Sequence, residues 1–164
     1  MRFIAHRGLT DGPDERMQNR PDQIVKALDH GFEAEIDLWH VDGKWVLGHD
    51  GPEHEIEFDY LKQKGLWIHC KNLDALFALR SQTHHYNFFW HESDLVTLTS
   101  TNIVWTYFGK PETVSPMSVC VMPEATYEWP DIEAMVRSWN WYGFCSDHVN
   151  RLRAWQSSHC ALRD

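Results

Sequence analysis

The feature of this chain that most limits its possible folds is an alternation of short apolar segments with amphipathic segments. The amphipathic segments 21–30, 72–79 and about 130–139 have helical spacing, and Gly31 follows the first of them as a stop signal. Strands separated by helices predict a parallel sheet with right-handed crossovers, either open and doubly wound or closed into a barrel. The segments predicted as strands are 3–5, 34–38, 45–47, 66–70, 87–90, 103–107, 118–122 and 142–146.

The length of the chain bounds how complete such a sheet can be. Its 164 residues fit one domain, 1–164, with a hydrophobic share of 43% that is ordinary for a globular protein. A barrel of eight strand–helix units usually needs about 250 residues. We therefore expect one α/β domain in which a barrel, if formed, has some helices reduced to loops.

Charge and apolar content exclude several classes of partner. The net charge of −9 argues against a nucleic acid held through its phosphates. The sequence shows no signal peptide and no stretch near the ~18 apolar residues of a membrane span, so we expect a cytoplasmic protein without an integral membrane segment. The oligomeric state stays open. Cys70, Cys120, Cys145 and Cys160 have no CxxC spacing and are predicted to be buried free thiols.

Two carboxylates share one face of the strand predicted at 34–38. Glu35 and Asp37 are two residues apart, so their side chains point to the same side. Carboxylates that face one interior repel each other unless a cation joins them, and oxygen ligands favour Mg²⁺, Ca²⁺ or Mn²⁺. A strand whose acidic residues face solvent is the alternative interpretation of an isolated ExD pair.

His6 and Arg7 directly follow the first predicted strand, and His49 follows a hairpin-like segment at 43–48. An imidazole can move a proton near neutral pH, and a guanidinium holds two phosphate oxygens in a fixed fork. Hydrolysis of a diester needs one base and one acid, which His6 and His49 can supply. A capping or core histidine is the alternative for His6, and a surface turn is the alternative for His49.

The strand predicted at 66–70 ends in the same way. His69 and Lys71 lie on one side of it, and Lys71 can bring positive charge to a phosphate. Polar side chains at the carboxyl ends of parallel strands gather at one edge of a barrel, which is where its active site forms. Trp39, Trp90 and Trp105 are candidate stacking surfaces for a sugar, although core packing explains tryptophans equally well.

In their order along the chain, these motifs resemble the glycerophosphodiester phosphodiesterase family of the phospholipase C-like superfamily. That family shows HRG, a Pro-Glu-Asn-Thr-like loop, ExD, a glycine turn with HD, and ExK. Order and spacing agree over the first 71 residues, whereas residues 74–141 match only as an alternation of strands and helices. The matching segments are His6-Arg7-Gly8, Asn19-Arg20-Pro21, Glu35-Ile36-Asp37, Gly48-His49-Asp50, His69-Cys70-Lys71 and the closing Gly143 to His148.

The resemblance implies a fold and an activity. The fold is a compact TIM-type (β/α) barrel, short for its class. The activity is hydrolysis of glycerophosphodiesters to glycerol 3-phosphate and an alcohol, and relatives with the same core cleave lysophospholipids or sphingomyelin. The implied roles are metal ligands for Glu35 and Asp37, an acid–base pair for His6 and His49, and phosphate holders for Arg7 and Lys71.

Two positions depart from the family pattern. His69 replaces the third carboxylate ligand, and Gln18 replaces the glutamate of the loop before Asn19. We expect a divalent cation, Mg²⁺ or Ca²⁺, at Glu35, Asp37 and His69, and the imidazole nitrogen also admits Mn²⁺ or Zn²⁺.

These departures leave two alternatives. One is a non-catalytic barrel that binds a phosphorylated glycan or a lipid head group. The other is a metal-independent phospholipase C-like enzyme, in which an arginine takes the place of the ion. Among the substrates, a bulky sugar-phosphate diester with Trp105 as a contact surface is one candidate. The sequence does not decide which histidine is acid and which is base.

Overall fold

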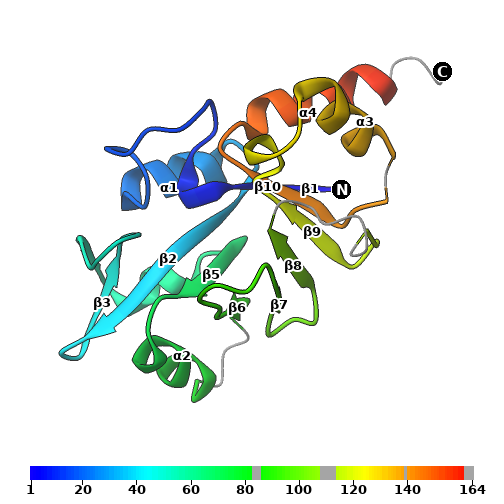
Figure 1. Ribbon diagram of the computed structural model, residues 1–164. Helices are drawn as coiled ribbons and strands as arrows, with labels where there is room; N and C mark the ends of the chain where they lie inside the picture. The colour runs from blue at the N-terminus through cyan, green and yellow to red at the C-terminus, as the bar shows by residue number, and fades with distance from the viewer. Residues whose placement is uncertain (83–85, 108–113, 139, 161–164) are drawn as a thin grey trace.

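The computed structural model describes residues 1–82, 86–107, 114–138 and 140–160 (Figure 1). None of the helices in this part combines the length and the apolar character that a bilayer span requires. The helices are α1 (Pro21–Asp29), α2 (Leu73–Arg80), α3 (Trp129–Ser138) and α4 (Val149–Cys160). The strands are β1 (Arg2–Ala5), β2 (Glu33–Val41), β3 (Lys44–Leu47), β4 (His54–Ile56), β5 (Leu66–Cys70), β6 (Phe88–Phe89), β7 (Val96–Leu98), β8 (Val104–Tyr107), β9 (Ser118–Val121) and β10 (Gly143–Ser146).

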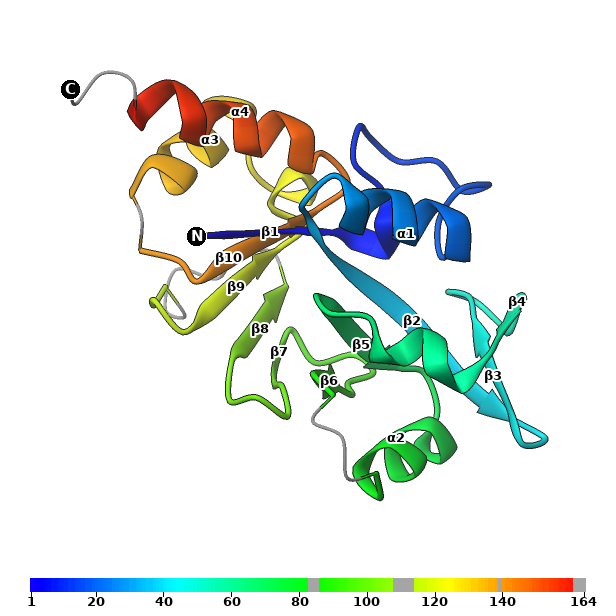
Figure 2. The same cartoon turned by 180° about the vertical axis from the view of Figure 1, so that it is seen from behind.

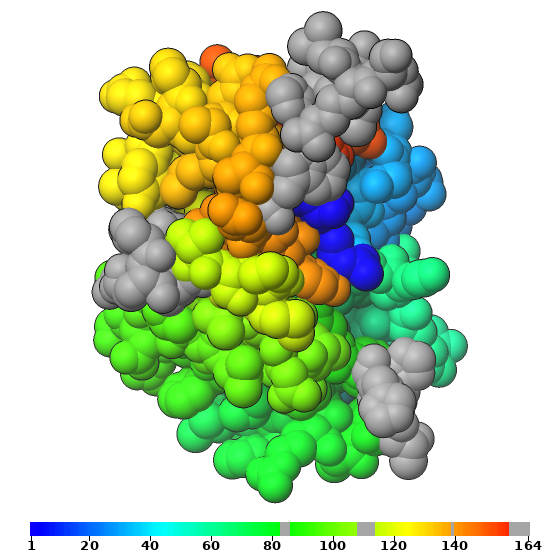
Figure 3. Space-filling view, turned by 90° about the vertical axis from the view of Figure 1, so that its right-hand side faces the viewer, coloured from blue at the N-terminus to red at the C-terminus, as the bar shows by residue number. Residues whose placement is uncertain are grey.

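One curled sheet joins these strands. Its parallel part has the order β6-β5-β2-β1-β10-β9-β8, so the first strand pairs with the last. The first half of β2 pairs with β1 and β5, and its last four residues pair with the antiparallel β3. In the space-filling view the N-terminal residues, in dark blue, lie against orange residues from the C-terminal part of the chain (Figure 3).

The sheet is a partial barrel, and the prediction of a closed one was wrong. No ladder joins β6 to β8 within the described residues. The antiparallel β7 occupies the edge of β8 that would otherwise face β6, and β6 is only two residues long. Ser100 bridges the gap, because its backbone N–H donates to the carbonyl of Phe88 at 2.8 Å and its Oγ accepts from the N–H of Phe88 at 2.9 Å.

Several crossovers between parallel strands lack an α-helix, as expected for so short a chain. Helices α1, α2 and α3 connect β1 to β2, β5 to β6, and β9 to β10. The β3–β4 hairpin and a 3-10 turn at Phe58–Lys62 stand between β2 and β5, and β7 stands between β6 and β8. Figure 2 shows α3 and α4 side by side, close to β1 and β10.

Each predicted strand and helix corresponds to an element of the structure, with small differences at the ends. Asn72 caps α2, since its side chain accepts a hydrogen bond from the N–H of Ala75. Trp139, where the third predicted helix ended, lies outside the described residues. The sequence did not predict α4, because Val149 and Leu152 are the fully buried side chains among those described in it, and the pattern around them is polar.

Side chains alternate between the two faces of the sheet and form two apolar clusters. The outer cluster packs the helices against the strands. The inner cluster lies on the inner face of the curled sheet and consists of Ile4, Trp67, Phe89, Ile103, Trp105, Val119, Val121 and Cys145. Cys70, Cys120 and Cys145 are buried and free, which confirms the thiol prediction for these three, whereas the side chain of Cys160 is not described.

Candidate active site

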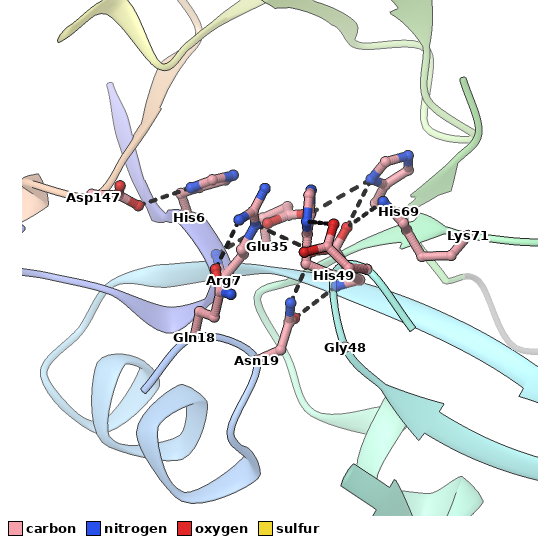
Figure 4. Close-up of polar contacts among 12 residues, drawn as sticks. His6, Arg7, Gln18, Asn19, Glu35, Gly48, His49, His69, Lys71 and Asp147 are labelled. Carbon is pink, nitrogen blue, oxygen red and sulfur yellow. Dashed lines mark hydrogen bonds and ion pairs between the residues drawn. The ribbon is translucent and has the colours of Figure 1, made fainter. Parts of the chain in front are cut away.

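Polar side chains continue the inner face of the sheet beyond its apolar cluster. Two residues after Ile4 stands His6, and Glu35 and Asp37 lie on the same face of β2. Asp37 is paired in register with His69 of β5, so their side chains are neighbours. The sequence-predicted residues therefore converge on one cavity of about 260 Å³, which is lined by His6, Arg7, Glu35, Asp37, His49, His69, Lys71 and Trp105. Figure 4 shows His6, Glu35, His49 and His69 from different strands and turns near one another.

Asp37 is the most heavily bonded side chain of this cavity, and it is 1% exposed. Its Oδ1 lies 3.0 Å from Nδ1 of His69 and 3.4 Å from Nζ of Lys71, and its Oδ2 lies 3.3 Å from Nε of Arg7. Burial by itself would raise the pKa of Asp37, but the hydrogen bond and charge of His69, with the charges of Lys71 and Arg7, hold it below its usual value. These neighbours therefore favour the ionised form of the Asp37 side chain.

Glu35 has a different environment, although it is also buried. Burial and the neighbouring charge of Asp37 raise the pKa of Glu35. Its Oε2 accepts a hydrogen bond from the backbone N–H of Arg7 at 3.0 Å. Arg7 adopts a left-handed conformation with φ of 51°, which is uncommon for a residue other than glycine and turns the chain at the end of β1.

The loop before α1 holds the Asp37 carboxylate in place through Asn19. Asn19 is fully buried, and its amide Nδ2 donates to Oδ2 of Asp37 at 2.8 Å while its Oδ1 accepts from the N–H of Asp37 at 2.9 Å. The neighbouring Gln18, which departs from the family pattern, accepts a hydrogen bond from Arg7 at 2.8 Å. Both loop residues therefore orient charged groups of the cavity.

His6 has a partner that the sequence prediction did not include in the site. Its Nδ1 lies 2.8 Å from Oδ1 of Asp147, which directly follows β10. Burial lowers the pKa of His6, but the hydrogen bond to Asp147 and the charge of Glu35 outweigh it, and the pKa is raised overall. The sequence signal for Asp147 is its position directly after the last apolar strand, which ends at Ser146. Glu124 accepts hydrogen bonds from the Ser146 hydroxyl at 2.6 Å and from the N–H of Asp147 at 3.0 Å.

His49 stands opposite, on the turn that follows β3. Trp39 anchors this turn, because its indole N–H donates to the carbonyl of Gly48 at 2.7 Å. The His49 ring is partly exposed, and its Nδ1 lies 2.7 Å from Oδ1 of Asp50. Burial and the positive charge of Arg7 lower the pKa of His49. The two histidines thus meet the same cavity with pKa values displaced in opposite directions.

Glu35, Asp37 and His69 form a group that fits a divalent cation. One ligand atom from each lies within 4.8 Å of the others. Nδ1 of His69 lies 4.0 Å from Oε1 of Glu35, in addition to its contact with Asp37. Two buried carboxylates and an imidazole nitrogen are a donor set suited to a metal ion.

A further histidine lines the cavity without having been predicted. His91 follows the strand predicted at 87–90, and the rule that polar residues after strands mark the site would have found it. Its ring is nearly parallel to that of His69, at 4.6 Å between centroids. Burial and the nearby charges of His69 and Lys71 lower the pKa of His91 to about 4, so that the ring is neutral.

The three candidate tryptophans lie in different places. Trp105 is 4% exposed and packs against Phe89 and Trp67 at the floor of the cavity, so its contact with a substrate stays a prediction. Trp39 donates its hydrogen bond to the carbonyl of Gly48, in the turn before His49, and Trp90 is 37% exposed.

A second cavity, of about 540 Å³, adjoins the first. The two share His6, Arg7, His49 and Tyr107, which therefore stand between them. The second cavity is otherwise lined by the loop after β1 and by Asp50, Met122 and Asp147.

Comparisons with known proteins bear on the fold. No protein-family model and no curated protein matches the chain. Among solved structures, a crystal structure of a glycerophosphodiester phosphodiesterase from Parabacteroides distasonis is similar, with a TM-score of 0.58 and 13% sequence identity. The similarity covers 97% of this chain and 98% of that one. At this identity it shows a shared fold over nearly the whole length of both chains.

Proposed function

We propose that this protein is a phosphodiester hydrolase that acts on a glycerophosphodiester or a related sugar-phosphate diester. The observation that carries the proposal is the convergence of His6, His49 and Arg7 on one cavity that also holds the Glu35, Asp37 and His69 group. The activity named for the structurally similar protein from P. distasonis agrees with it. Two proton carriers and a cationic phosphate site are what hydrolysis of a diester requires.

The histidines divide the proton transfers between them. His49, whose pKa is lowered, takes a proton from a water molecule as its oxygen bonds to phosphorus. His6, whose pKa is raised, gives its proton to the alcohol oxygen as the phosphorus–oxygen bond breaks. Asp147 keeps the His6 ring in position through Nδ1. The products are a phosphomonoester and an alcohol.

Cationic groups offset the charge of the phosphoryl oxygens. Arg7 and Lys71 both line the cavity and are the candidate phosphate holders. A divalent cation bound by Glu35, Asp37 and His69 would add Lewis-acid stabilisation of the same oxygens.

The two adjoining cavities suit a substrate with two arms. A phosphodiester carries one alcohol on each side of its phosphorus atom. Because His6, Arg7 and His49 stand between the cavities, a phosphate placed among them can extend one arm into each. The smaller, partly aromatic cavity suits a compact arm, and the larger one admits a bulkier polar arm.

A metal-independent enzyme is the second candidate, and one observation favours it. Asp37 already contacts Arg7 and Lys71, so part of the charge that an ion would supply is present in the protein. In such an enzyme those two side chains alone neutralise the phosphate.

Turnover of bis-p-nitrophenyl phosphate and glycerophosphocholine, measured with EDTA and after adding back divalent ions, tests the proposal. We expect activity that His6→Gln and His49→Gln each reduce by about 10²–10⁴-fold. His54→Gln, on β4 outside both cavities, is the matched control. Absence of turnover with every ion, in protein that still binds phosphate ligands, would favour the non-catalytic alternative; activity unaffected by EDTA would favour the metal-independent one.

A further inference from the structure

His69 stands where the resembling family has a carboxylate, and its ring stacks on two others, those of Phe89 and His91. Phe89 is the last residue of β6, and His91 lies two residues after it, outside the strand. The rings of His69 and Phe89 are 5.1 Å apart with an interplanar angle of 7°, and those of His69 and His91 are 4.6 Å apart at 6°. Rotation of the His69 ring about χ2 would break both contacts, so the ring has one preferred plane.

The nitrogen atoms of His69 have different surroundings. Nε2 lies 3.4 Å from the backbone carbonyl oxygen of His91, and a carbonyl only accepts hydrogen bonds. Nδ1 lies 3.0 Å from Oδ1 of Asp37, which also only accepts, so without an ion this shorter contact is a hydrogen bond from Nδ1 to Asp37. An ion at Nδ1 would take the place of that hydrogen, and Nε2 would then carry the hydrogen toward the His91 carbonyl, which is the usual arrangement of a metal-binding histidine. Nδ1 also lies 4.0 Å from Oε1 of Glu35, so an ion at Nδ1 would meet the carboxylates of both Asp37 and Glu35.

With an ion bound, Nδ1 of His69 and the carboxylates of Asp37 and Glu35 would be three electron-pair donors around one point. A site of one imidazole nitrogen and two carboxylates suits a first-row transition ion better than an all-oxygen site does. Ca²⁺, in contrast, takes six to eight oxygen ligands.

From these contacts we infer that the stack of Phe89, His69 and His91 makes His69 a nitrogen ligand, and that the site selects an ion such as Mn²⁺ over Ca²⁺. His91 is in this view a positioning residue, which acts through its ring and its carbonyl on His69. The inference rests on the metal-binding part of the proposed function and specifies its ion.

Direct binding of metal to the full chain tests the inference without any assay of activity. Titration of the metal-free protein, followed by calorimetry and by the electron paramagnetic resonance of Mn²⁺, should give one Mn²⁺ site with at least about tenfold preference over Ca²⁺. His69→Glu, which restores a carboxylate, should reverse the preference by weakening Mn²⁺ binding relative to Ca²⁺. His69→Ala should weaken Mn²⁺ binding by about 10–100-fold.

Two substitutions of His91 test the stack. His91→Ala removes the ring but keeps the backbone carbonyl, and we expect it to weaken Mn²⁺ binding by about tenfold. His91→Phe keeps a flat ring against His69 and should restore the affinity to within about threefold of the original chain. His40→Ala is the control, because the His40 ring also packs against an aromatic ring, that of Trp45 at 4.3 Å between centroids, but lies outside the cavity.

Each of three results would overturn the inference: a folded chain that binds no Mn²⁺, a preference that His69→Glu leaves unchanged, or equal Mn²⁺ affinities for His91→Ala and the original chain. These results are separable from failure of the proposed function. Mn²⁺ binding without turnover of any diester contradicts the hydrolase and supports the metal site. Turnover in EDTA by a chain that binds no Mn²⁺ supports the hydrolase and overturns the metal site.

Discussion

Nδ1 of His6 lies 2.8 Å from Oδ1 of Asp147, a contact between residues 141 positions apart in the sequence. It forms because β1 and β10 are parallel neighbours in register, with Ala5 opposite Ser146, and each polar residue directly follows its strand. The side chains that follow two paired strands thus meet at one edge of the sheet.

Asp147→Asn should reduce kcat on a diester by about 10–100-fold with a smaller effect on KM, because an amide orients the His6 ring without stabilising its protonated form. Steady-state kinetics over a range of pH measure this effect. Asp131→Asn, at an exposed position of α3, should change neither constant. A pH profile identical to that of the original chain would exclude Asp147 from the proton transfer.

Gly48→Ala should displace His49 and lower kcat by about tenfold or more. Gly48 has φ of 154°, and a Cβ atom there would collide with the carbonyl oxygen of Gly51. Gly51→Ala provides the matched control in the same turn, because a Cβ at that position meets nothing within 4 Å. Equal activity of the two variants would show that the turn does not position His49.

Asn19→Ala should lower the free energy of unfolding by about 2–3 kcal/mol, since it removes both amide contacts from the buried Asp37. Urea denaturation in EDTA measures the loss. Asn140→Ala, at an exposed position, should stay within about 0.5 kcal/mol of the original chain. A small loss at Asn19 would mean that water replaces the amide beside Asp37.

The stability that His6 contributes should depend on pH in a defined direction. Its pKa in the folded protein is raised above 6.5, so the protonated ring favours the folded state. The difference in free energy of unfolding between the original chain and His6→Gln, in EDTA, should be largest below about pH 6 and should decrease as pH rises above about 6.5. In an Asp147→Asn background the difference should vary less with pH. A difference that grows with rising pH would contradict the direction of the shift.

The sequence predicted most of the elements and most of the residues of the candidate site; it did not predict β4, β7 or α4. Apolar periodicity predicted β3 and the parallel strands, and polar residues toward the carboxyl ends of the apolar segments brought His6, Asp37 and His69 into one prediction. The same rule, applied at residues 87–91 and 143–147, would have included His91 and Asp147. These signals are local, because they depend on alternation along a single strand.

Only the tertiary structure decided how the sheet ends and how the site is charged. Whether β6 meets β8 depends on which strand takes a shared edge, and the antiparallel β7 takes it. The opposite pKa displacements of His6 and His49 and the stacking of His69 on His91 depend on burial and on neighbours from other strands. Pairing and burial are properties of segments far apart in the sequence, and no single segment contains them.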